Sequence, residues 1–387
     1  MSALVSEEIS TGPGRNASLQ DLVALLGDEY RRRVDVVVPM SRLRAEGGSI
    51  VISGVEPIIS EDGVLPVDGT YPPTAVGEEG LADKLGIPLA YLRRLRATHS
   101  PLFDENANGW FSHPQFGEKR VLLRALRGRG CAGGDGVLRA VLSQHYQSID
   151  HLDALTAVLD GVQRAGAPIQ IDGADLTDRR MYVRIRSEEV HALAPVLLRN
   201  YRSPFSGASG IDNPVVWAGF EISNSESGCG AFSIVPRLVV QVCGNGLTIT
   251  KDAVKRVHLG GRLEDGVVRW SVATQRKAID LIAARAADAV STFLNVDYLR
   301  GRLEEIERDA AAPITDPTAT IQAVARQQAY ADAERDLILR HFIAGADLTA
   351  GGVLHAVTSA ARTLPDADRS HELEAGGLAA LHLAATV

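Results

Sequence analysis

The chain has 387 residues, of which 45% are hydrophobic, 23% charged and only 5% aromatic, and its formal net charge is −8. This composition is typical of a globular protein, and the length predicts two or three packed units. Three scattered cysteines exclude a disulfide framework and a structural zinc site. No run approaches the roughly 18 apolar residues of a membrane helix, and Met1 to Glu8 lack the pattern of a secretion signal. We therefore expect a cytoplasmic protein without a membrane segment.

Charge is distributed unevenly along the chain. Residues 1–118 carry 10 basic and 17 acidic side chains, residues 119–302 carry 24 and 18, and residues 303–387 carry 6 and 13. We interpret these as an acidic α/β N-terminal segment, a basic α+β core domain and an acidic helical C-terminal unit. A basic segment between acidic flanks is typical of polyanion binding, although an Arg-rich composition scattered over a solvated surface gives the same numbers.

In the first segment the pattern predicts a short helix at Leu19–Leu26 and strands at Val34–Pro39 and Ser49–Ser53. Helical periodicity follows from Leu81 to Leu95, with a break at Gly86-Ile87-Pro88. This break resembles the turn of a helix-turn-helix, whose second helix would carry arginines toward phosphate. We favour a structural corner between two helices, because Pro88 is a common helix-start residue and the segment is acidic.

The middle segment begins with a predicted strand at Arg120–Leu126, a glycine-rich loop at Gly128–Gly136 and a helical region from Val137 to Arg164, in which Asp150 would cap a second helix. Apolar residues then recur with period two. The predicted strands are Ile169–Ile171, Arg180–Ile185, Val215–Asn224, Gly230–Val235 and Leu238–Val242, the last three forming an antiparallel meander. A helix is predicted at Val272–Leu294.

From Asp297 onward the pattern is helical. An amphipathic stretch from Leu303 to Phe342 is broken at Pro313 and Pro317, Thr349 would cap the next helix, and Asp366–Ala385 forms the last. The chain is therefore predicted to be α+β, with an antiparallel meander and packed helices in the middle domain and a helical C-terminal unit.

Two motifs resemble parts of catalytic sites, but we favour a structural role for each of them. Gly128–Gly133 matches G-x-G-x-x-G, but the acidic residue that a dinucleotide site needs about 20 positions later is missing. Cys243 with His258 is a conceivable nucleophile pair, but a cysteine directly after a core strand is usually buried. The ten histidines form no metalloprotease-type spacing, so no metal or cofactor is predicted.

The strongest binding signal is the run Arg199-Asn200-Tyr201-Arg202-Ser203-Pro204-Phe205, which interleaves cations with aromatic rings. Single-stranded nucleic acid is bound in this way, with cations on phosphates and rings stacked on bases. Further cations follow the meander, and Lys251 and Lys255 would share a helix face. The alternative is that Tyr201 and Phe205 only anchor a loop. The predicted nucleic-acid-binding residues are Arg199, Tyr201, Arg202, Lys251, Lys255 and Arg256.

Several runs together resemble the phage/plasmid-like protein family, a domain of unknown function. They cover roughly residues 75–300 and are Leu85–Pro88 with Tyr91-Leu92, Asn106–Trp110, Leu138–Tyr146, Glu221–Gly228, Val242–Gly246 and Lys255–His258. The resemblance implies a role in mobile-element DNA metabolism and transfers no catalytic residue. The core of that family, a helix, an antiparallel meander and a further helix, is similar to that of single-strand annealing proteins.

We therefore expect a non-enzymatic, homo-oligomeric protein that binds or anneals single-stranded DNA in recombination, without a cofactor. Two alternatives remain open. One is a phage or plasmid scaffold or regulatory protein that binds other proteins, in which case its basic residues would be scattered. The other, ranked last, is an enzyme that uses Cys243.

Overall fold

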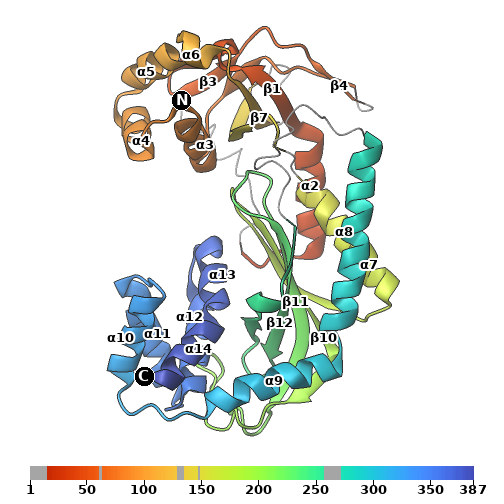
Figure 1. Ribbon diagram of the computed structural model, residues 1–387, viewed down its shortest axis with the longest axis vertical. Coiled ribbons are helices and arrows are strands. Elements are labelled where there is room, and N and C mark those ends of the chain that lie inside the picture. The colour runs from red at the N-terminus through yellow and green to blue at the C-terminus, as the bar shows by residue number, and fades with distance from the viewer. Residues whose placement is uncertain (1–14, 61–62, 129–134, 147–148, 257–271) are drawn as a thin grey trace.

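The computed structural model of the protein describes residues 15–60, 63–128, 135–146, 149–256 and 272–387 (Figure 1). In these ranges helices pack on antiparallel sheets, and the C-terminal part is helical. The α+β fold expected from the sequence, with its helical C-terminal unit, is confirmed. No helix in the described part of the chain is long and apolar enough to cross a lipid bilayer.

Three antiparallel strands form the main sheet of an N-terminal lobe, which we define as residues 33–143. They are β1 (Arg33–Pro39), β7 (Arg120–Arg127) and β8 (Gly136–Ser143), in that order across the sheet. Strand β1 continues directly from helix α2 (Leu19–Arg32). Because β7 pairs with β1 and β8 pairs with β7, a domain boundary after residue 118 would divide a single sheet.

Strand β8 corrects one prediction, since the pattern from Val137 onward was expected to be helical. Residues Gly136 to Val141 are all buried, because β7 lies beside the strand and helix α3 (Ala75–Leu85) packs across it. A strand that is buried on both faces shows no polar–apolar alternation, so an apolar run of this length fits a helix equally well. The next helix begins only at α7 (His151–Ala165).

Three more helices and two small sheets complete the lobe. The helices are α4 (Leu89–Thr98), α5 (Ser100–Ser112) and α6 (Pro114–Gly117). One sheet contains β2 (Leu43–Glu46), β3 (Ser49–Ile52) and β6 (Gly69–Tyr71), and the other is a hairpin of β4 (Ile58–Ser60) and β5 (Gly63–Leu65).

The corner between α3 and α4 is built as the sequence predicts. Helix α3 ends at Gly86, whose φ of 70° is in the left-handed region that glycine adopts readily, and Pro88 precedes α4. Arg93 and Arg96 of α4 both bond to Glu78 of α3, at 3.0 and 2.6 Å. These two arginines therefore hold the corner together, in agreement with its structural interpretation.

The central sheet is formed by six strands of the middle segment. Its order is β13-β12-β11-β10-β9, all antiparallel, with β14 also paired to β12. The strands are β9 (Gln170–Leu176), β10 (Met181–Leu193), β11 (Val215–Asn224), β12 (Phe232–Val240), β13 (Asn245–Thr248) and β14 (Val254–Arg256). Helices α2, α7 and α8 (Val272–Phe293) share one hydrophobic core with this sheet, and the C-terminal helices share a second (Figure 1).

Strand β12 was expected as two strands separated by a turn at Pro236. It is one strand, because Pro236 lies where its outer neighbour is interrupted between β13 and β14. The carbonyl of Pro236 accepts from the Ile249 N–H at 2.8 Å on that same side. A proline is tolerated in a strand where no partner requires its missing N–H, and the gap supplies that position.

The C-terminal part consists of six helices. They are α9 (Val296–Ala310), α10 (Pro317–Gln327), α11 (Asp332–Gly345), α12 (Ala350–Thr363), α13 (Ala367–Ala375) and α14 (Gly377–Thr386). Every residue of α12 from Ala350 to Ala361 is buried, so this helix is the centre around which the others pack. Thr349 caps α12 by accepting from the Gly352 N–H, as predicted.

The close approach of α3 to β8 is testable with two helical glycines. A Cβ added to Gly80 would lie 2.6 Å from the Val141 carbonyl oxygen, whereas one added to Gly109 in α5 meets nothing within 4 Å. We expect Gly80→Ala to lower the free energy of unfolding by about 1–3 kcal/mol through overpacking. Gly109→Ala should raise it by roughly 0.5–1 kcal/mol through helix propensity. Urea unfolding measures both; equal effects at the two positions would contradict this packing.

Candidate nucleic-acid interface

The loop that begins at Arg199 is fixed to the C-terminal helices. The Arg202 N–H donates to the Gly345 carbonyl of α11 at 3.1 Å. Tyr201 is only 2% exposed, and its ring is stacked on His355 of α12 with centroids 4.1 Å apart. Tyr201 is therefore an anchor of the loop, as the alternative interpretation of this run held, and its ring is not accessible to a base.

Phe205 carries the exposed aromatic surface of this loop. Its side chain is 47% exposed, the guanidinium of Arg362 from α12 lies 4.8 Å from its ring centroid, and His341 lies at 6.0 Å. Arg362 also donates to the carbonyl of Cys243, in the turn between β12 and β13. Two runs that the sequence analysis singled out separately thus meet at this arginine.

We call the exposed cations and ring of this loop, together with Arg362, the cation–aromatic seam and define it as Arg199, Arg202, Phe205 and Arg362. Arg199 and Arg202 are exposed, and in the described part of the chain neither forms an ion pair with a carboxylate. Arg362 could not be found by sequence reasoning, because it belongs to the acidic C-terminal unit and reaches Phe205 only through the tertiary fold. The exposed cations and ring are a combination that suits phosphate and a base face.

The other three predicted residues lie elsewhere. Lys251 is in a short 3₁₀ helix (Thr250–Asp252), and its Nζ bonds to Glu305 of α9 at 2.7 Å. Lys255 and Arg256 are in β14, opposite Ser233 and Phe232 of β12. The expectation that Lys251 and Lys255 share a helix face is therefore wrong, because the chain extends there to pair with β12. The side chains of Lys255 and Arg256, and His258, lie outside the described atoms.

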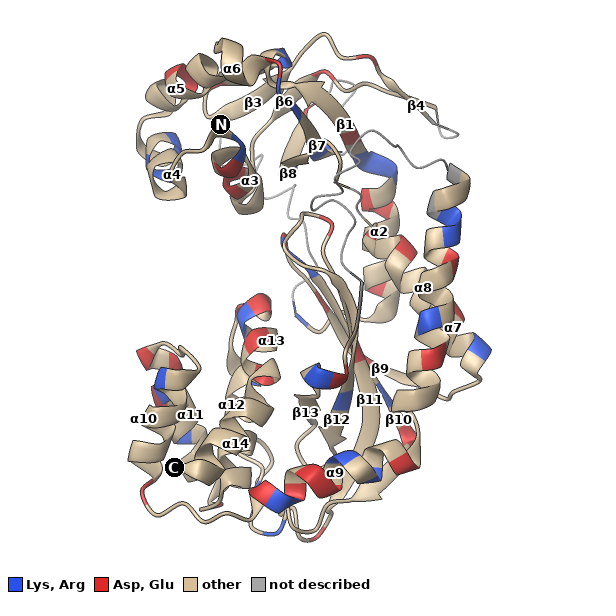
Figure 2. Cartoon of the chain, in the orientation of Figure 1, with Lys and Arg blue, Asp and Glu red and all other residues tan. Residues whose placement is uncertain are grey.

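Part of the basic charge of the middle segment is neutralised inside the protein. Arg124, Arg139, Arg184 and Arg237 of the basic segment are all less than 9% exposed. Each bonds to carboxylates, several of which come from the acidic flanks, such as Asp35, Glu29 and Glu374. On the surface, basic and acidic positions alternate along α8 and α9 (Figure 2). The basic residues are therefore distributed among many elements.

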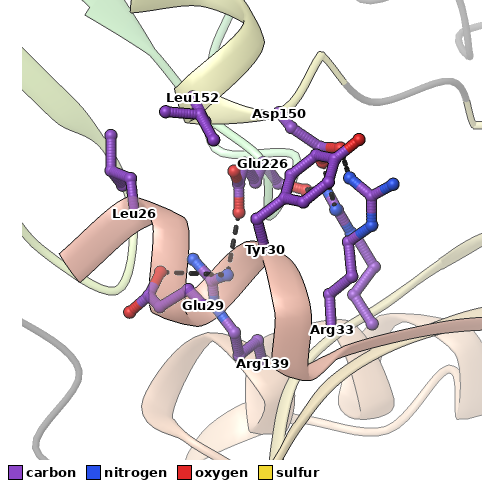
Figure 3. Close-up of a pocket in the computed structure, with 9 residues that line it drawn as sticks. Leu26, Glu29, Tyr30, Arg33, Arg139, Asp150, Leu152 and Glu226 are labelled. Carbon is purple, nitrogen blue, oxygen red and sulfur yellow. Dashed lines mark hydrogen bonds and ion pairs between the residues drawn. The ribbon is translucent and has the colours of Figure 1, made fainter. Parts of the chain in front are cut away.

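One buried network joins the N-terminal lobe to the central sheet (Figure 3). We call it the junction cluster and define it as Glu29, Arg33, Arg124, Arg139, Asp150 and Glu226. Arg124 bonds to Asp150 at 2.6 Å and to Asp35 at 2.9 Å, and Arg139 bonds to Glu226 at 2.8 Å. Asp150 precedes α7, as predicted, but its carboxylate binds Arg33 and Arg124 and does not cap the helix.

The junction cluster is a structural element with no room for a substrate. The cavity that it lines has a volume of about 10 Å³, about the space of one water molecule. Burial alone would raise the pKa of the Glu226 carboxyl, but the charges of His151 and Arg139 hold that pKa well below its ordinary value. Burial raises the pKa of Glu29, whose neighbour Arg139 only partly offsets it. Arg139, Tyr146 and Glu226 come from runs that carried the family resemblance, and those runs meet here.

A second buried network attaches α13 to the central sheet. His371 lies between Asp175 at 2.9 Å and Glu221 at 2.8 Å, and its ring is stacked on Tyr182 with centroids 3.7 Å apart. On the same helix, Glu374 bonds to Arg237 at 2.8 Å. Burial alone would lower the pKa of His371, but the two carboxylates that flank it raise the pKa to about 9. The imidazolium form is therefore the stable one at neutral pH.

Of the two motifs associated with catalysis, the structure describes Cys243 and the strands that flank the glycine-rich loop, while His258 lies outside the described residues. The glycine-rich loop joins β7 to β8, two neighbouring antiparallel strands, so it is not the strand-to-helix turn of a dinucleotide fold; residues 129–134 themselves lie outside the described ranges. Cys243 is half-buried and packs against the C-terminal core. Among the described residues, no group of three His, Cys, Asp or Glu side chains is placed to bind a metal ion.

The junction cluster predicts a large cost for removing one charge. Glu226→Gln leaves Arg139 buried beside a neutral group, and we expect a loss of about 3–5 kcal/mol in the free energy of unfolding. Asp160→Asn, which breaks the exposed pair of α7 with Arg164, should change stability by less than about 0.5 kcal/mol. Urea denaturation of both variants tests this, and similar losses for the two would contradict a buried network.

The network around His371 predicts an alkaline loss of stability. The raised pKa means that the protonated form favours folding, so the contribution is complete below the ordinary pKa of 6.5 and is lost as the pH rises through about 9. The difference in unfolding free energy between the wild type and His371→Asn should therefore shrink between these two pH values. Urea unfolding across this range measures it, and a difference independent of pH would show that His371 is neutral.

Comparison of the chain with protein-family models, with curated proteins and with solved structures finds no match in any of the three. The resemblance to the phage/plasmid-like family therefore stays a prediction from the quoted runs.

Proposed function

We propose that this protein binds single-stranded DNA on the cation–aromatic seam, as a non-enzymatic component of strand pairing in mobile-element DNA metabolism. The observation that carries the proposal is the exposed ring of Phe205, with the guanidinium of Arg362 at 4.8 Å and the exposed Arg202 on the same loop. An aromatic face stacks on any base, and flanking cations contact the phosphates, so this combination binds single strands with little sequence preference.

The fixed geometry of the loop supports this assignment. Buried Tyr201 and the bond from the Arg202 N–H to Gly345 hold the loop against α11 and α12. Phe205 and Arg202 are consequently presented from an ordered backbone, and less conformational entropy is lost when a ligand binds. The order of α7, the antiparallel strands β9 to β12 and α8 also matches the core that the family resemblance implies.

A second candidate, a scaffold that binds other proteins, is favoured by a different observation. The buried arginines of the middle segment are neutralised by carboxylates, and many exposed cations also have acidic partners, such as Lys251 with Glu305. The net charge of the middle segment is therefore no independent evidence for a polyanion partner. Under this alternative the seam would bind an acidic, apolar protein surface.

Binding of labelled oligothymidylate over a salt series tests the proposal. If each of the three arginines of the seam neutralises one phosphate, log affinity should fall against log salt concentration with a slope of about −2. Each contact on a single strand contributes about −0.7 to that slope. The five cations predicted from the sequence would give a slope of about −3.5. No binding at low salt would contradict the proposal and favour the scaffold.

Two variants and a matched control locate the site. Phe205→Ala should weaken binding roughly five- to one-hundred-fold, the effect of losing one base–aromatic stack, and Arg202→Ala should make the salt slope less steep by about 0.7. Arg300→Ala removes an exposed cation on α9, which lies 3.9 Å from Asp297, and we expect it to leave affinity unchanged. Equal losses for Arg300→Ala and Arg202→Ala would show that binding depends on net charge and not on the seam.

A further inference from the structure

The imidazole of His341, on helix α11, lies beside the exposed ring of the seam. Its centroid is 6.0 Å from that of the Phe205 ring, at an interplanar angle of 59°, and the guanidinium of Arg362 lies 4.8 Å from the same Phe205 centroid. Helix α11 packs against α12, and the His341 ring bonds to Ser359 of α12. An imidazole and a guanidinium from two packed helices therefore flank the Phe205 ring.

A hydrogen bond determines which nitrogen of His341 can gain a proton. The Ser359 hydroxyl has one hydrogen, which it donates to the Ala356 carbonyl at 3.2 Å. The Ser359 oxygen therefore accepts from the Nδ1–H of His341 at 2.9 Å. In the neutral imidazole the proton is thus on Nδ1. Nε2 bonds to none of the described residues, and it is the atom that binds an additional proton.

His341 differs from the other three histidines of residues 303–387, because its positive charge would have no partner. His355 is fully buried, and burial lowers its pKa to about 4. His371 is a cation between two buried carboxylates, and the exposed His382 bonds to Asp309 at 2.6 Å. His341 is partly exposed, and no carboxylate among the described residues forms an ion pair with it. An external anion can therefore supply the missing partner.

The groups around His341 favour its neutral form in the free protein. Burial, and then the positive charge of Arg340 on the same helix, lower the pKa of the His341 imidazole below its ordinary value of 6.5. From α12 and the loop it meets the Ser359 hydroxyl and the Phe205 ring, with the Arg362 cation on that ring. A phosphate close to the imidazole would act in the opposite direction and raise the pKa. Phosphates flank every base of a strand that stacks on Phe205.

We propose that His341 binds single-stranded DNA together with the seam and takes up a proton when the strand binds. This inference rests on the proposed function and adds regulation by pH to it. A base stacks on Phe205, a neighbouring phosphate contacts Arg362 and His341, and the proton on Nε2 makes the imidazole a second cation for that phosphate. Affinity therefore rises as the pH falls through the range between the pKa of His341 in the free protein and its higher pKa in the complex.

Oligothymidylate binding at constant ionic strength, from about pH 8 to about pH 5.5, tests the inference across the range in which histidine titrates. Thymine and the phosphodiester do not titrate there, so a proton that is taken up binds to the protein. If the strand raises the pKa of His341 by one unit, the wild type should bind about tenfold more tightly at the acid end. His341→Gln retains an amide for Ser359, and we expect it to match the wild type at about pH 8 and to show no increase on acidification.

The control variant is His382→Gln, which removes an exposed histidine of the same helical unit and should follow the wild type at every pH. Circular dichroism verifies that each variant is folded. Binding by the wild type that is equally tight at every pH, or a full pH dependence in His341→Gln, overturns the inference and leaves the proposed function standing. Absence of binding at every pH overturns the proposed function, and the inference with it.

Discussion

The need to neutralise buried arginines is the constraint on which the rest of this structure depends. Arg124, Arg139 and Arg237 lie in the interior, where an unpaired charge would cost several kcal/mol. Their carboxylate partners come partly from the acidic segments on either side, through Asp35, Glu29 and Glu374. The basic middle segment is therefore paired with both acidic segments through buried ion pairs. One network of these pairs joins the N-terminal lobe to the central sheet, and a second joins α13 to that sheet.

This internal neutralisation reduces the number of arginines that can bind a ligand. The arginines in these networks are unavailable to a ligand, and Lys251 is held by Glu305. Among the described residues, the cation–aromatic seam offers exposed arginines on a fixed loop, and it combines residues of the middle segment with Arg362 of α12. Its chemistry suits an anionic partner with an apolar or aromatic face, such as single-stranded DNA.

Local patterns predicted the fold better than they predicted the site. Strand Val215–Asn224, the caps at Thr349 and the corner at Gly86 follow from local rules, and all three are confirmed. The helix expected from Val137 was wrong because a doubly buried strand has no period of two. The turn expected at Pro236 was wrong because the interruption that tolerates this proline lies in another strand. Arg362 and Phe205 are 157 residues apart in the sequence (362 − 205), so no local pattern could predict their contact.

Photochemical crosslinking tests the central claim most directly, since it identifies the residues that touch a bound strand. A single strand that contains 4-thiothymidine is irradiated with the full-length protein, and the crosslinked peptides are mapped by mass spectrometry. If the seam is the one cationic surface that binds DNA, crosslinks fall at Phe205 and on the peptide that contains Arg362. Crosslinks confined to the β14 region around Lys255, or to the outer face of α8, would contradict the account.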